Sequence, residues 1–196
     1  MPIRSNLSRI MCEAPSELRC VLCTNRLSPV LPALVNTAGL SLVGLVHPAQ
    51  TLDSINAIRQ HTTAKIPLFE YLPEHSHKLA DFLHDVNAQL LVVHGFQHII
   101  PQAILEQCPG VNLHPSLLPA YPGLNPWQEQ LQANPTTGGY TVHMLSPKAD
   151  AGTILAQAEF PWPRHSVNLL QIRDDSLRNC GIPLLIKTLL KFTTTK

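Results

Sequence analysis

Gly110-Val111-Asn112-Leu113-His114-Pro115-Ser116-Leu117-Leu118-Pro119 joins a short apolar strand pattern to a polar end. Pro115 and Pro119 disfavour a helix here, because proline has no backbone N–H and restrains the residue before it. On an extended segment, side chains two positions apart point to the same side. The amide of Asn112 and the imidazole of His114 are therefore expected side by side at the carboxyl end of a strand.

Strand and helix patterns alternate on both sides of this stretch. Strands are expected over 20–23, 40–46, 66–71, 89–93, 110–113, 140–145 and 153–160, and helices over 29–38, 77–87, 101–108 and 166–190, the last interrupted at Pro183. This alternation predicts an α/β domain with a mostly parallel central sheet and helices on both faces. A chain of 196 residues fits one such domain. We expect it over residues 19–196, after a loose N-terminal arm at residues 1–18, which show no periodicity.

The composition describes a compact protein without a nucleic-acid or membrane partner. Hydrophobic residues make up 44% and charged residues 14%, and the net charge is 14 − 13 = +1 with no basic run. An apolar segment of about 18 residues is not approached, and the N-terminus lacks a signal pattern. The five cysteines, at positions 12, 20, 23, 108 and 180, are too scattered for a disulfide framework. These features favour a cytoplasmic protein.

A second polar tract, Asp150-Ala151-Gly152-Thr153-Ile154, supplies a carboxylate beside a glycine. Gly152 allows a sharp turn or a close approach of a ligand to the backbone. An amide, an imidazole and a carboxylate that converge on one point can stabilise an oxyanion and move a proton. Taken alone, the pair Asn112 and His114 is also typical of a structural site in which the imidazole bonds a backbone carbonyl.

The motifs N-x-H-P-S-L-L-P and D-x-G-x-I, with Asn112, His114 and Asp150 in this order, resemble the formyltransferase family that uses 10-formyltetrahydrofolate. His143 precedes Asp150 by seven positions (150 − 143), as it does in the glycinamide ribonucleotide members. The segment 92–101 is similar to the one that forms part of the folate pocket. The resemblance, which includes the N-terminal domain of the methionyl-tRNA members, implies a single-domain, Rossmann-like formyltransferase fold.

The resemblance also implies roles for individual residues. Asn112 and His114 would polarise the formyl oxygen, while Asp150 would favour the charged form of His114 and receive the proton lost by the amine. Residues expected at the folate donor are Phe96, Gln97, His98, Ile99, Ile100 and Ala149, and those expected to support the site are His143, Ser116, Gly123 and Gly152. The reaction is the transfer of a formyl group to a small amine, and the oligomeric state stays open, with a homodimer as one option.

No metal is expected to take part. Cys20 and Cys23 are three positions apart, so on a strand they face opposite sides of the sheet, and no second ligand pair has metal spacing. His143 is expected either to line the pocket or to brace the Asp150 loop. His94 and His98 are expected to hold their own loop by hydrogen bonds or to touch the ligand.

Three departures from the family pattern narrow the acceptor. The turn at 24–29 has no glycine, so a backbone cradle for a substrate phosphate is not expected there. The chain ends 36 residues after Phe160 (196 − 160) and is nearly neutral, whereas the methionyl-tRNA members have a second domain and basic surfaces, so initiator tRNA is not expected. Pro122 stands in Tyr121-Pro122-Gly123 where members usually carry arginine, which puts the geometry of this loop in question.

The acceptor itself stays open among an amino sugar, an amino acid side chain and another small amine. Two other functions remain as alternatives. One is hydrolysis of formyltetrahydrofolate, although the deformylase relatives carry an additional N-terminal domain. The other is a non-catalytic protein that binds folate or a partner.

Overall fold

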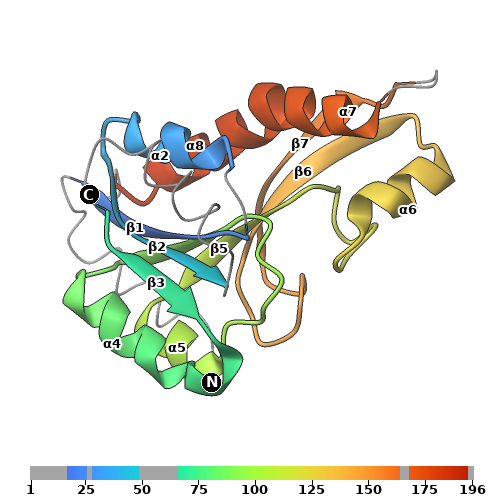
Figure 1. Cartoon of the computed structure of the whole chain (residues 1–196). Coiled ribbons are helices and arrows are strands. Elements are labelled where there is room, and N and C mark those ends of the chain that lie inside the picture. Colours follow the sequence, from blue (N-terminus) through green and yellow to red (C-terminus); the bar gives the residue numbers. More distant parts are fainter. Residues whose placement is uncertain (1–16, 26–27, 49–65, 164–167, 194–196) are drawn as a thin grey trace.

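A twisted sheet forms the centre of the molecule (Figure 1). This computed structural model describes residues 17–25, 28–48, 66–163 and 168–193. Of the arm expected at residues 1–18, residues 1–16 lie outside them, and Leu18 already belongs to the first strand. The strands are β1 (Leu18–Cys23), β2 (Leu40–Pro48), β3 (Leu68–Tyr71), β4 (Leu90–Val93), β5 (Gly110–His114), β6 (Thr137–Met144) and β7 (Ile154–Pro161). Their order across the sheet is β3-β2-β1-β4-β5-β6-β7. The pairings among β1 to β5 are parallel, and β6 and β7 pair antiparallel, which confirms the mostly parallel sheet.

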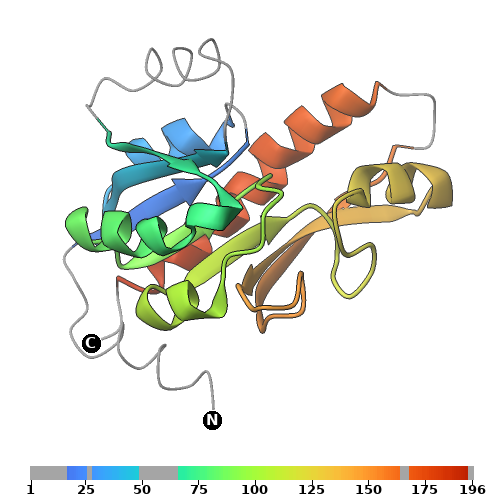
Figure 2. The same cartoon turned by 60° about the horizontal axis from the view of Figure 1, so that its bottom comes forward.

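Helices cover both faces of this sheet (Figures 1 and 2). The helices are α2 (Val30–Val35), α4 (His77–Asp85), α5 (Gln102–Gln107), α6 (Pro126–Ala133), α7 (Leu169–Ser176) and α8 (Ile182–Leu190). Helices α2, α7 and α8 lie on one face and α4 and α5 on the other, while α6 lies beside the long β6–β7 hairpin (Figure 1). The expected α/β architecture is confirmed. Helix α6 and the short 3-10 turn Pro73–His75 were not among the predicted elements.

The strands alternate between two separate hydrophobic cores. Cys20 and Leu22 pack into the core under α2, α7 and α8, whereas Val21 and Cys23 pack into the core under α4 and α5. Side chains of adjacent strand residues point to opposite faces, which explains this division. The prediction that Cys20 and Cys23 face opposite sides of the sheet is therefore confirmed. Burial raises the pKa of Cys20 to about 12, so its thiol stays protonated.

The closing helix is interrupted as the position of Pro183 predicts, but the interruption begins earlier. Helix α7 passes into a π-helical turn, Leu177–Gly181, before α8 begins at Ile182. Pro183 lies in the first turn of α8, directly after this π-helical turn. The π turn absorbs the change of hydrogen-bond register between the two helices.

The strand order places a crevice at one edge of the sheet. From β1 the chain proceeds outward to β2 and β3 and then returns to β4 on the other side of β1. At such a reversal the connections after the two central strands diverge, and ligands bind beyond the carboxyl ends of the strands. Among the described residues, no helix has the length and apolarity needed to cross a membrane.

The hairpin that carries Asp150 gives a prediction about Gly152. A Cβ atom at this position would overlap the backbone carbonyl of Met144, which cannot move without breaking the β6–β7 pairing. We therefore expect Gly152→Ala to lower the free energy of unfolding by about 2 kcal/mol or more. Urea unfolding measures the change, with Ala151→Ser as an exposed control expected within about 0.5 kcal/mol of the wild type. An unchanged midpoint for Gly152→Ala would contradict the packing described for this hairpin.

Candidate functional site

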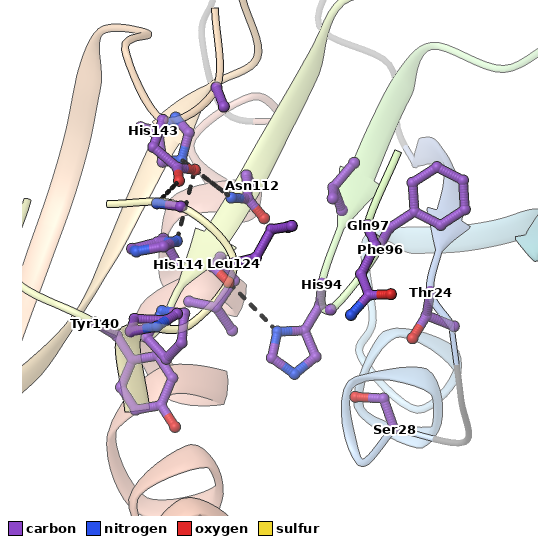
Figure 3. Close-up of a pocket in the computed structure, with 18 of the residues that line it drawn as sticks. Thr24, Ser28, His94, Phe96, Gln97, Asn112, His114, Leu124, Tyr140 and His143 are labelled. Carbon is purple, nitrogen blue, oxygen red and sulfur yellow. Dashed lines mark hydrogen bonds and ion pairs between the residues drawn. The ribbon is translucent and has the colours of Figure 1, made fainter. Parts of the chain in front are cut away.

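A pocket of about 690 Å³ opens at the carboxyl ends of β1, β4 and β5. Its lining comes from the turn after β1, the segment 93–100 after β4, the end of β5, the β6–β7 loop and helices α6 and α7. The side chains of Asn112, His114 and His143 lie on one side of His94 in Figure 3, and those of Phe96 and Gln97 on the other. A cavity of this size suits a ligand as large as a cofactor.

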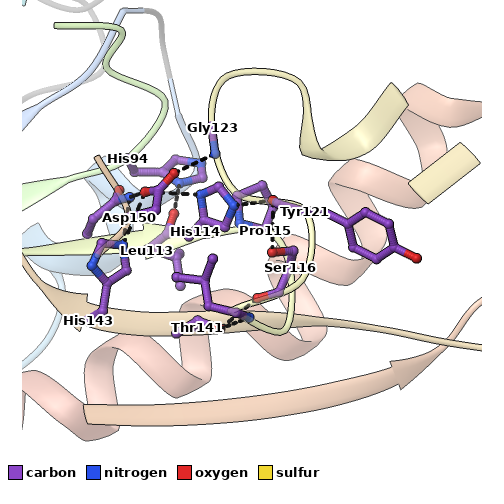
Figure 4. A network of polar contacts seen from close by, with 12 residues as sticks. His94, Leu113, His114, Pro115, Ser116, Tyr121, Gly123, Thr141, His143 and Asp150 are labelled. Atoms are coloured by element: carbon purple, nitrogen blue, oxygen red, sulfur yellow. Dashed lines mark hydrogen bonds and ion pairs between the residues drawn. The ribbon is translucent and has the colours of Figure 1, made fainter. Parts of the chain in front are cut away.

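The Asp150 carboxylate stands at the centre of a polar cluster (Figure 4). Its Oδ1 accepts a hydrogen bond from Asn112 Nδ2 at 3.2 Å, and its Oδ2 accepts one from the backbone N–H of Gly123 at 2.7 Å. Two imidazoles approach Oδ1, His114 through Nδ1 at 3.5 Å and His143 through Nε2 at 3.4 Å. The three residues expected to converge therefore do so, and His143 joins them.

Sheet register explains why His143 belongs to this cluster. Asn112 on β5 pairs directly with His143 on β6, so that their side chains share a face, and Asn112 Nδ2 lies 3.1 Å from His143 Nε2. A register shift in the β6–β7 pairing falls between Val142 and His143. Such irregularities re-aim side chains. The chain then returns through the β6–β7 loop to Asp150, which adopts a left-handed backbone conformation with φ 50°.

Main-chain atoms of the loop 119–123 hold the other side of the cluster. His114 Nε2 donates to the carbonyl of Tyr121 at 2.9 Å, and Ser116 Oγ donates to the carbonyls of Ala120 and Tyr121. Tyr121 and Gly123 both have positive φ, 52° and 93°, which turns the Gly123 N–H toward Asp150. The Tyr121 ring points away from the cluster (Figure 4).

Burial and charge oppose each other in this cluster. Burial raises the pKa of Asp150, but the contacts with His143 and His114 and the hydrogen bond from the Gly123 N–H outweigh it, and the pKa lies below its ordinary value. For His114, burial lowers the pKa, and the hydrogen bond to Tyr121 together with the charge of Asp150 offsets only part of this effect. Asp150 does favour the charged form of His114, as expected, but burial outweighs its effect on the pKa, because the ring is only 4% exposed.

The hydrogen bonds define where protons reside. His143 Nδ1 donates to the Met144 carbonyl at 2.9 Å, so in the neutral ring Nε2 accepts from Asn112. His114 donates through Nε2 to Tyr121, so the nitrogen that can gain a proton is Nδ1, which faces Asp150. A separation of 3.5 Å is too long for a firm hydrogen bond. A proton that lies between His114 Nδ1 and Asp150 Oδ1 can therefore also form a hydrogen bond to a ligand oxygen.

The structure separates the predicted site residues into two groups. Those that line the pocket are Phe96, Gln97, His98, Ile99, Ile100, Asn112, His114, Gly123, His143, Ala149 and Asp150. Ser116 is fully buried and acts behind the pocket, through Tyr121. Gly152 packs against the Met144 carbonyl and is absent from the described lining, so the close approach expected at this glycine is to backbone and not to ligand.

Two of the open expectations are also resolved. His143 both lines the pocket and approaches Asp150. His94 Nδ1 lies 3.4 Å from the Leu113 carbonyl, whereas His98 contacts the rings of Tyr71 and Phe96, and both imidazoles line the pocket.

Several lining residues were not predicted from the sequence: Thr24, Ser28, Leu124, Trp127, Leu170, Arg173, Asp174 and Leu177. Thr24 and Ser28 follow β1, so the rule that ligands bind beyond strand ends could have found them. Leu124 and Leu170 belong to segments 46 positions apart (170 − 124) and carry no motif. Only the packing of α6 and α7 around the hairpin brings such residues to one cavity.

Comparison with known proteins agrees with this geometry. The family model described as formyl transferase matches residues 34–169, which include Asn112, His114, His143 and Asp150. The chain belongs to this family.

Sequence relatives fall into two groups. The chain is 33% identical over 112 residues to a phosphoribosylglycinamide formyltransferase of Haemophilus influenzae, covering 56% of this chain and 53% of that protein. It is 28% identical over 173 residues to a methionyl-tRNA formyltransferase of Rickettsia bellii, covering 82% of this chain and 55% of that protein. The matched regions thus span about half the length of these relatives.

Solved structures show the same fold. A glycinamide ribonucleotide transformylase of Symbiobacterium toebii superposes with a TM-score of 0.79 at 20% identity, over 91% of this chain and 88% of that one. A formyltetrahydrofolate deformylase of Pseudomonas syringae superposes with a TM-score of 0.73 at 18% identity, over 90% of this chain and 61% of that one. The Rossmann-like formyltransferase fold is confirmed.

The lowered pKa of His114 gives a prediction about stability and pH. The folded ring binds a proton less readily than the unfolded ring, so the stability it contributes is present above pH 6.5 and is lost as the pH falls. We expect the wild type to lose more stability between about pH 7.5 and about pH 5.5 than His114→Gln does. Urea unfolding of both proteins at the two pH values measures the difference, with the exposed His84→Gln as control. Equal losses in wild type and His114→Gln would show that burial does not disfavour the charged ring.

Proposed function

We propose that this protein transfers a formyl group from 10-formyltetrahydrofolate to the primary amine of a small acceptor. The observation that carries the proposal is the convergence of Asn112, His114 and Asp150 at the mouth of a pocket of cofactor size. Membership of the formyl transferase family supports the reaction class. Relatives named for glycinamide ribonucleotide and for methionyl-tRNA support different acceptors, and the near-neutral charge of +1 favours the small one.

The donor supplies the formyl carbon. In the proposed site Phe96, Gln97, His98, Ile99, Ile100 and Ala149 would hold it, because these residues line the part of the pocket formed by the β4 segment and the β6–β7 loop. The acceptor nitrogen forms a bond to the formyl carbon while the bond from that carbon to N10 of the donor breaks. The amine loses one proton, and the released donor nitrogen gains one.

In the proposed reaction, residues of the Asp150 cluster stabilise the charge that develops on the formyl group and hold the proton that is released. Negative charge develops on the formyl oxygen, and donors aimed at it lower the barrier. Both N–H groups of Asn112 are engaged, with Asp150 and His143, so one must be exchanged for the formyl oxygen. Asp150 keeps its hydrogen bond from Gly123 during this exchange, which limits the cost.

The proton from the amine has a defined destination. Asp150, whose pKa is below its ordinary value, is ionised at neutral pH and attracts the ammonium form of the acceptor, which releases one proton to solvent before the neutral nitrogen attacks. Nδ1 of His114 lies 3.5 Å from the carboxylate, so the pair can hold the proton between them. Because burial keeps His114 neutral before the reaction, the ring starts with a vacant site for that proton.

Substitution at the cluster tests the proposal. We expect Asp150→Asn and Asn112→Ala each to reduce kcat by about a hundredfold or more, because each removes a group that acts on developing charge or on the proton. Transfer to an amine panel that includes glycinamide ribonucleotide and an amino sugar nucleotide measures kcat, and calorimetry measures binding of the folate donor, which should change little. The control is Asp85→Asn, an exposed carboxylate on α4. Near wild-type turnover of Asp150→Asn would show that the assigned role is wrong.

Hydrolysis is the second candidate, because a deformylase shares the fold. Incubation with the folate donor alone separates the two reactions. If the protein is a transferase, formate release without amine should be at least about a hundredfold slower than transfer, because water is not positioned as the acceptor is. Rapid formate release that an amine does not suppress would favour the hydrolase. Donor binding without formate release or transfer would favour a non-catalytic folate-binding protein.

A further inference from the structure

The wall of the pocket formed by α6, α7, the turn after α7 and the residues before α6 carries four large apolar side chains. Leu124, Trp127, Leu170 and Leu177, here called the apolar wall, all line the pocket. They lie outside the β4 segment and the β6–β7 loop, which are assigned to the folate donor under the proposed function. If the donor occupies those two segments, the acceptor must contact what remains. The apolar wall then indicates that part of the acceptor is apolar.

Exposed apolar side chains gather at this pocket. The described residues include five exposed large hydrophobic side chains: Ile99, Leu124, Leu131, Ile154 and Leu170. Three of them line the pocket, and of these Leu124 is 70% and Leu170 is 62% exposed. These three residues come from separate segments of the sequence, so the fold, and not a continuous apolar stretch, brings them together at the pocket. Covering such side chains with an apolar ligand yields about 25 cal/mol per Å² of area removed from water.

Four described backbone N–H groups at the turn after β1 are used inside the protein. Thr24 donates to Val46, Asn25 to Gly95, Val30 to the Ser28 hydroxyl and Leu31 to the Ser28 carbonyl. Pro29 has no N–H to offer. Phosphate cradles depend on several N–H groups that point at the ligand. Residues 26 and 27 lie outside the described residues.

The turn also has a structural task. Asn25 Oδ1 accepts a hydrogen bond from the backbone N–H of Gln97 at 3.3 Å, in addition to the bond from Asn25 N–H to the Gly95 carbonyl. The two bonds tie the turn after β1 to the segment after β4. The polar groups of Asn25 therefore position the pocket's own loops.

The formal charge of the described pocket lining also favours an acceptor that carries an amine. Apart from histidines, the charged residues in it are Arg173, Asp150 and Asp174, with a sum of 1 − 2 = −1. The Arg173 guanidinium carbon lies 6.0 Å from the centre of the Trp127 ring, so this cation is placed over the apolar wall. The described lining thus has one more carboxylate than cations, which favours an ammonium group.

We propose that the acceptor is a primary amine on an apolar body without phosphate, and that the apolar wall binds this body. The inference rests on the proposed formyl transfer and adds the acceptor's chemical class. The amine would point toward Asp150, and the rest of the acceptor would cover Leu124 and Leu170.

A matched set of amines tests this inference on the full chain. With 10-formyltetrahydrofolate as donor, we expect kcat/KM for phenethylamine to exceed that for phosphoethanolamine and for glycinamide ribonucleotide by about tenfold or more. A preference for either phosphorylated amine would overturn the inference and leave formyl transfer intact. If none of the three is formylated, calorimetry of phenethylamine binding decides: saturable binding supports the apolar wall, and no binding overturns it.

Substitutions locate the binding surface. Leu170→Ser and Leu124→Ser should each raise KM, or Kd, for phenethylamine by about fivefold or more, because each removes an apolar contact. KM for 10-formyltetrahydrofolate should stay the same. Leu131→Ser is the matched control, since Leu131 is 50% exposed on α6 and is absent from the described lining. An increase in the KM for the folate donor alone would assign the wall to the donor and overturn the inference.

Discussion

A single buried carboxylate organises three separate segments of this protein. The Asp150 side chain is 10% exposed, and it meets Asn112 from β5, the Gly123 N–H from the loop after β5, and His143 from β6. A charge that is largely withdrawn from water must be paired or fully hydrogen-bonded. If one of these segments shifts, the carboxylate loses a partner. A shift of one segment therefore also costs contacts made by the other two.

The sequence predicts this site well where the signal is local. Asn112 and His114 are two positions apart on a strand, and both side chains reach Asp150 as their spacing implies. The strands are predicted because apolar runs between turn residues are strong local signals. Helix α6 was missed, since its apolar residues are few and it follows the proline-rich stretch at 115–126. The apolar wall was missed for a different reason: its members come from separate segments, and no periodicity records which segments pack together.

The protonation of His114 shows what a sequence cannot supply. A nearby carboxylate favours the charged imidazole, and Asp150 does act in that direction. Burial acts in the other direction and outweighs it, because the His114 side chain is only 4% exposed. The balance depends on exposure, which follows from tertiary packing. A neutral His114 beside an ionised Asp150 forms a pair that is ready to accept a proton, and a charged His114 would already have its proton.

The loop 119–123 contacts the cluster through its main chain and not through the side chain of Pro122. The contacts of this loop with the cluster are made by main-chain atoms, the Tyr121 carbonyl and the Gly123 N–H, and by Ser116 from behind. Pro122 is exposed and its side chain is not needed to hold these atoms. The geometry of the cluster on this side is thus maintained by backbone, whereas exposed side chains such as Leu124 and Leu170 also line the pocket. Because the two sets of contacts are independent, these side chains can change with the acceptor while the Asp150 cluster stays the same.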